Sequence, residues 1–78
     1  MDDPADTLRR DSAELAELAR RLRDLAVRLR ADGAAPPWFE AVLNGQIMRC
    51  TLASAHLADA ARRVQAHAEA PRRRPMEW

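Results

Sequence analysis

The sequence lacks several residue types on which particular functions depend. Cys50 is the only cysteine among 78 residues, so no internal disulfide can form. There is no lysine, which excludes Schiff-base catalysis by a lysine amine. With no tyrosine and one phenylalanine, the chain has no row of aromatic rings on which nucleic-acid bases could stack. Metal-ligand spacing is also absent, and we expect no cofactor.

Long hydrophobic runs are missing as well. No apolar stretch approaches the roughly 20 residues that a membrane-spanning helix needs. The first residues do not have the apolar segment of a secretory signal peptide. We therefore expect a soluble, cytoplasmic protein with no membrane span.

Charge is nearly balanced, with a net value of +1. All thirteen basic residues are arginine, which together with the many alanines is typical of a GC-rich genome. Acidic and basic residues are balanced along most of the chain, and only residues 71–78 are biased towards positive charge. This balance excludes a grossly basic or acidic protein.

The first part of the chain has the pattern of a long amphipathic helix. Asp3 before Pro4 is typical of a helix start, and Asp32-Gly33 followed by Pro36-Pro37 is typical of a helix end. Between them, leucines recur at spacings of three and four, as in a heptad seam: Leu8, Leu15, Leu18, Leu22, Leu25 and Leu29. The pattern predicts a helix over residues 4–32.

A second helix is predicted over residues 37–70, where Pro71 is expected to end it. Apolar and small residues step by four and three along one face: Phe39, Leu43, Ile47, Cys50, Ser54, Leu57, Ala61, Val64 and Ala68. Asn44-Gly45 lies inside this segment and could divide it into two helices; we favour one continuous helix. The short linker then forces an antiparallel return.

The predicted fold class is all-α, an antiparallel helical hairpin over residues 1–70 with an extended basic tail over 71–78. Seventeen of its 37 hydrophobic residues are alanine, so few large side chains are available for a core. A hairpin this small is only marginally stable alone, and neither a disulfide nor a metal can support it. We expect it to assemble into a four-helix or larger bundle, with the leucine seam inside the hairpin and shared with another subunit.

A second apolar surface is expected near the turn. Trp38, Val42, Met48 and Leu52 cluster on the side of the second helix opposite its main apolar stripe. Exposed apolar patches of this kind usually mark interfaces. The alternative is that Trp38 folds back over the turn and packs there.

The remaining candidates carry weaker signals. Arg72, Arg73 and Arg74, with Trp78 as an anchor, could bind a partner protein or the phosphates of nucleic acid, the latter weakly. His56 and Asp59, three residues apart, could orient an imidazole, although no nucleophile accompanies them.

The sequence therefore predicts a small non-enzymatic interaction protein. It would self-associate, as a homo-oligomer such as a dimer, or dock onto a larger protein through helical packing. The partner-binding residues would be Leu15, Leu18, Leu22, Leu25, Leu29, Trp38, Val42, Met48 and Leu52. A nucleic-acid-associated regulator is the alternative, and an enzyme whose site forms between subunits is a minor one.

Overall fold

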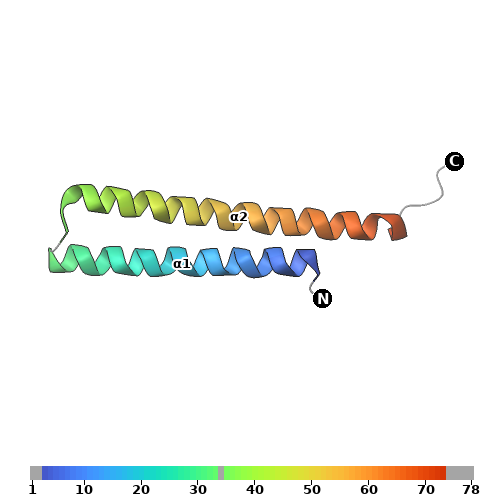
Figure 1. Cartoon of the computed structure of the whole chain (residues 1–78), viewed down its shortest axis with the longest axis horizontal. Coiled ribbons are helices and arrows are strands. Elements are labelled where there is room, and N and C mark those ends of the chain that lie inside the picture. The colour runs from blue at the N-terminus through green and yellow to red at the C-terminus, as the bar shows by residue number, and fades with distance from the viewer. Residues whose placement is uncertain (1–2, 34, 74–78) are drawn as a thin grey trace.

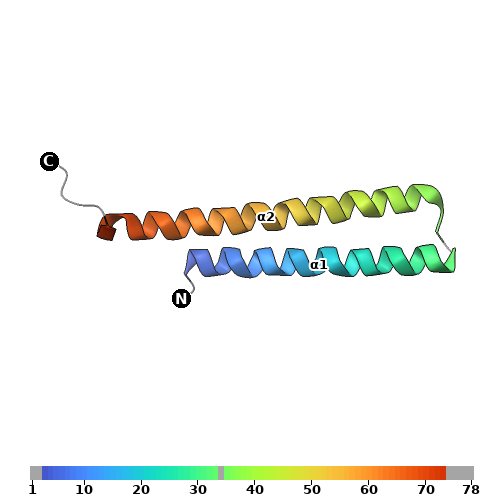
Figure 2. The same ribbon diagram turned by 180° about the vertical axis from the view of Figure 1, so that it is seen from behind.

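A computed structural model describes residues 3–33 and 35–73 of the chain, and these form two long helices lying side by side (Figures 1 and 2). Helix α1 spans Pro4–Asp32 and helix α2 spans Pro37–Arg73. They run antiparallel, which confirms the predicted all-α hairpin. The molecule measures 67 × 25 × 14 Å, and its radius of gyration of 18.8 Å exceeds the roughly 11–12 Å of a compact domain of this length.

The ends of α1 form for reasons visible in the sequence. Asp3 occupies the N-cap in an extended conformation, Pro4 supplies the first helical residue, and the Asp3 carbonyl accepts a 3.1 Å bond from the Thr7 amide. At the other end Gly33 is left-handed, with φ of 62°. Its amide donates to the carbonyls of Leu29 and Arg30, which would otherwise be unpaired at the helix end.

Helix α2 is continuous through Gly45, so the alternative of two shorter helices is not adopted. It also continues to Arg73, three residues beyond the predicted end at Ala70. Because Pro71 lies in the final turn, its missing amide removes only one bond of the helical ladder, and the turn is completed without it. Helix α2 has 37 residues against 29 in α1, so it overhangs the start of α1 (Figure 1).

The two helices touch along a line of small residues, here called the small-residue seam. It is formed by every seventh residue of α1 and the facing positions of α2: Ala5, Ser12, Ala19 and Ala26, with Ser54 and Ala61. Ala5, Ala19 and Ala61 are no more than 2% exposed. The absence of bulk lets the helix backbones approach closely, as small residues do at helix contacts generally.

Two serines fix the register at the middle of this seam. The Ser12 hydroxyl donates to the Ser54 carbonyl at 2.8 Å, and the Ser54 hydroxyl donates to the Ser12 carbonyl at 2.8 Å. Ser12 is therefore level with Ser54. From there each step forward along α1 matches a step back along α2, which places Ala5 opposite Ala61 and Ala19 opposite Ile47.

The two glycines make a matched test of backbone conformation. A Cβ added at either Gly33 or Gly45 would meet nothing within 4 Å, so only the backbone differs between the sites. Gly45→Ala should raise the free energy of unfolding by about 1 kcal/mol, because alanine favours the helix. Gly33→Ala should lower it by about 1 kcal/mol, because its left-handed φ disfavours a side chain. Chemical unfolding followed by circular dichroism measures both, and equal shifts of the same sign would contradict the assignment.

The small-residue seam makes a second prediction. Ala19 is 2% exposed against α2, so Ala19→Leu should push the helices apart and cost about 1–3 kcal/mol of unfolding free energy. Ala13→Leu, on the exposed surface of the same helix, is the control and should cost almost nothing. A thermal melt that is unchanged by Ala19→Leu would show that α1 and α2 do not meet at this line.

Candidate interaction surface

The hairpin has two unlike sides, because different residues flank the small-residue seam on each. Residues four positions after a seam residue lie on one side of the helix, about 40° from the seam. On α1 these include Arg9, Arg23 and Arg30, and each reaches across to α2. We call this side the arginine face.

The arginine face is closed by polar bridges between the helices. Arg9 donates to Gln65 Oε1 at 2.9 Å and Arg23 to Thr51 Oγ1 at 3.2 Å. Near the turn, the Arg30 guanidinium lies 2.7 Å from Glu40 Oε1. That hydrogen bond and the Glu40 charge raise the pKa of Arg30 above its ordinary value. The three bridges connect the two helices along this side.

The other side of the hairpin carries the leucines. Leu8, Leu15, Leu22 and Leu29 each follow a seam residue by three positions, which turns them about 60° to the side opposite the arginines. Leu18 and Leu25 each precede a seam alanine and lie farther round the same side. Since α2 runs antiparallel, residues displaced in the same sense fall on this side too: Phe39, Leu43, Gln46, Cys50, Ala53, Leu57, Ala60 and Val64. We call this surface the leucine face.

The leucine face is only partly covered by the hairpin itself. Leu15, Leu22, Leu25 and Leu29 are half-buried, and Leu18 is 43% exposed. Among the side chains that the structure describes, the buried ones are four alanines and Leu43, and no large side chain is fully buried. The expected leucine seam thus lies beside the line of helix contact and forms one wall of an open apolar surface.

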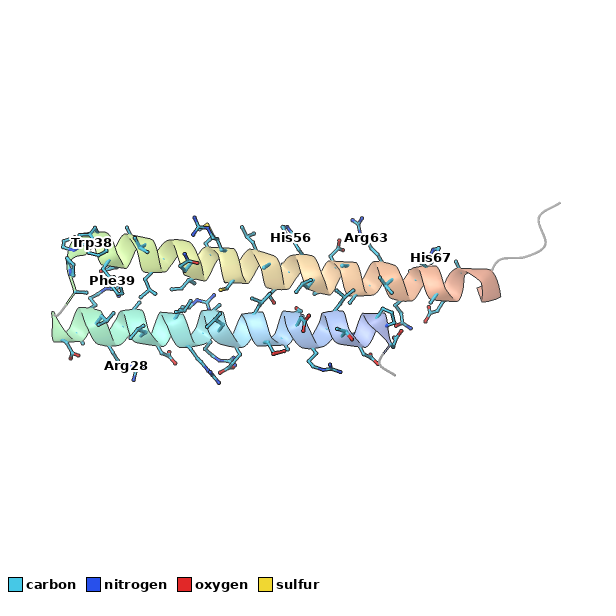
Figure 3. All side chains as sticks on the ribbon, in the orientation of Figure 1. Arg28, Trp38, Phe39, His56, Arg63 and His67 are labelled. Carbon is cyan, nitrogen blue, oxygen red and sulfur yellow. The ribbon has the colours of Figure 1, made fainter. Side chains whose placement is uncertain are left out.

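The outer patch expected from the sequence is exposed. Trp38 is 66% exposed, Val42 53%, Met48 64% and Leu52 52%. These residues span the back of α2, away from α1, with Val42 towards the leucine face and Met48 towards the arginine face. Trp38 does not fold back over the turn; its ring meets that of Phe39 edge-on at 5.9 Å and otherwise faces outward (Figure 3).

The turn end also contains a small hollow of about 200 Å³. Its walls are mainly apolar and include Ala26, Leu29, Phe39 and Leu43. The charged groups at its rim, Arg30 and Glu40, are already paired with each other. Among the described residues that line the hollow, the two charged side chains are therefore engaged with each other.

The possible His56–Asp59 pair is not formed. The Asp59 carboxylate instead accepts from Arg62 at 3.0 Å and lies 2.9 Å from Arg63. His56 and Arg63 point away from α1, as Figure 3 shows. An imidazole oriented by a carboxylate, which a proton-transfer site would need, is therefore not present at this position.

The arginine-rich tail falls largely outside the described residues. Arg72 and Arg73 belong to the last turn of α2, where only the backbone is described. Arg74 and Trp78 lie beyond the described part of the chain. The suggested binding by this tail stays a prediction.

Sequence reasoning missed the small-residue seam as the centre of the hairpin. The signal was available in the seven-residue repeat of Ala5, Ser12, Ala19 and Ala26. It was overshadowed by the leucines, whose larger apolar area made them the expected contact line. The arginine bridges to α2 were also missed, because they depend on the register between the helices.

In the described part of the chain, neither helix combines the length and apolar character needed to cross a membrane. Comparison with protein-family models, with curated proteins and with solved structures finds no match.

Proposed function

We propose that this chain is a non-enzymatic interaction protein that works as a self-associated helical bundle, in the cytoplasm, with the leucine face as its subunit interface. The observation that carries the proposal is the uneven packing of the hairpin. One side is spanned by polar bridges, while on the other a row of leucines is only partly covered.

The energetics of folding support the same conclusion. Alanines bury little area each, and four of the five buried side chains are alanines. The conformational entropy of some seventy ordered residues must still be offset, at about 1–2 kcal/mol per residue for the backbone alone. Covering the leucine face with a second copy would bury most of the leucines of the chain and supply the missing core.

The charge distribution allows such a face-to-face contact. Between Leu15 and Leu29, the positions of α1 that belong to the leucine face carry no charged residue. Arginines and acids lie on its outer edges or on the arginine face, where they remain in water. Protein interfaces usually have an apolar centre surrounded by a polar rim.

A measurement of mass tests self-association directly. Light scattering or sedimentation equilibrium at low micromolar concentration should give at least twice the 8.8 kDa mass of the chain. The thermal midpoint should rise with protein concentration, because association stabilises the folded state by mass action. A monodisperse, well-folded 8.8 kDa monomer with a concentration-independent melt would refute the proposal.

A matched pair of substitutions distinguishes the leucine face from the outer patch. Leu18 and Leu52 are 43% and 52% exposed, so glutamate at either costs the isolated hairpin little. Leu18→Glu should weaken self-association at least thirtyfold, because each copy loses an interface anchor worth about 2 kcal/mol. Leu52→Glu should leave it unchanged. The reverse result would move the subunit interface to the outer patch, and circular dichroism at high concentration checks that both variants stay helical.

A further inference from the structure

The outer patch is an apolar surface separate from the leucine face. Its four large side chains are each more than half exposed: Trp38, Val42, Met48 and Leu52. From the first to the last of them the helix rises about 21 Å, which is long enough for another helix to lie along it. The patch points away from α1, so self-association through the leucine face would leave most of it in water.

The patch has a low centre and a groove beside it. Gly45 follows Trp38 by one heptad and precedes Leu52 by one, and a Cβ added there would meet nothing within 4 Å. A shallow groove of about 500 Å³ is lined by Arg23, Asn44, Ile47, Met48, Thr51 and Leu52. A glycine between large side chains lets a second helix approach the backbone of α2 closely. Apolar anchors along such a surface are typical of proteins that bind an amphipathic helix.

The charges within and beside the patch are positive. Arg49 follows Val42 by seven residues, in the same row on the back of α2, and it is exposed. Arg23, which lines the groove, donates to the Thr51 hydroxyl, a neutral group that does not compensate its charge. Among the residues that the structure describes, neither arginine takes part in an ion pair.

No acid on the back of α2 is available to balance these arginines. Glu40, the one acid between residues 37 and 58, is turned towards α1 and pairs with Arg30. Asp59 lies beyond the patch and is held by Arg62 and Arg63. The patch therefore combines apolar side chains with uncompensated positive charge.

This combination defines the surface that would cover the patch. Burial of Arg49 under a partner removes the guanidinium from water, which is costly unless a carboxylate pairs with it. The covering surface must therefore present apolar side chains and an acid together.

A second copy of the chain does not present such a surface. Its own outer patch would bring another uncompensated arginine. The outer side of α1 carries acids, but they stand among arginines and without large apolar side chains: Glu17, Arg21, Asp24 and Arg28. The leucine face is occupied in the self-associated form, and this step rests on the function proposed above.

From this shape and charge we infer the partner of the outer patch. It is an acidic amphipathic helix of a different protein. The apolar side of that helix lies over Gly45 between Trp38 and Leu52, and its carboxylates pair with Arg49 and Arg23.

Two synthetic peptides that differ in charge provide the test. Both are amphipathic helices of about four turns with leucines on one face, flanked by glutamates in one peptide and by lysines in the other. Fluorescence anisotropy of the labelled peptides at low salt should show at least tenfold tighter binding of the glutamate peptide to the wild-type chain. Leu52→Glu should weaken that binding at least tenfold, and Arg49→Glu should remove or reverse the preference between the peptides.

The controls separate the patch from the rest of the surface. Arg28 points away from α2 (Figure 3), so Arg28→Glu should leave the preference unchanged. Leu18→Glu, which disrupts the leucine face, should bind the glutamate peptide as the wild-type chain does. If it does so although the wild-type chain is monomeric, the proposed function fails while the peptide site stands.

Three outcomes would overturn the inference. The first is equal affinity for the two peptides, or no binding of either. The second is a loss of self-association in Arg49→Glu, measured by light scattering, which would assign the patch to a second copy. The third is binding to vesicles of anionic phospholipid that depends on Leu52, in a chain that binds neither peptide, which would assign the patch to a membrane surface.

Discussion

The close approach of α1 and α2 along a line of alanines and serines is the constraint on which the rest of this molecule depends. Small residues allow the helices to meet, and the reciprocal bonds between Ser12 and Ser54 hold them in one register. Because residues without bulk occupy most of that line, most of the larger side chains flank the contact, although Leu43 is buried and Ile47 faces Ala19. The chemistry of the flanking side chains gives each side of the hairpin its character.

The two flanks follow from one sequence repeat. Four positions after the seam residues the chain has arginines, which are long enough to bridge to Gln65, Thr51 and Glu40 and keep their charges in water. Three positions after the seam it has leucines, which α2 shields from water only in part. A hairpin built in this way has a polar side whose arginines bridge the two helices and an apolar side whose leucines are only partly buried. That asymmetry is the basis of the proposed association through helical packing.

Charged groups near the turn and on the outer side of α2 are paired within the chain. The charged groups nearest the turn hollow neutralise each other, and Asp59 is held by two arginines. Large apolar side chains remain partly covered on the leucine face. Others are exposed at the back of α2, namely Trp38, Val42, Met48 and Leu52. Surfaces of this composition bind other protein surfaces.

The sequence by itself determined the fold class, the bounds of α1 and the start of α2, because local signals specify them. Pro4 starts one helix, the left-handed Gly33 ends it, and Pro37 starts the next. It also identified Trp38, Val42, Met48 and Leu52 as surplus apolar residues, since helical periodicity alone shows that one partner helix cannot cover two faces. Only the tertiary structure decided that the alanines form the contact line and that the leucines stand beside it. Periodicity gives the angle between two rows of residues on one helix, but which row meets the neighbouring helix depends on how closely the backbones approach, and that distance is set by both helices together.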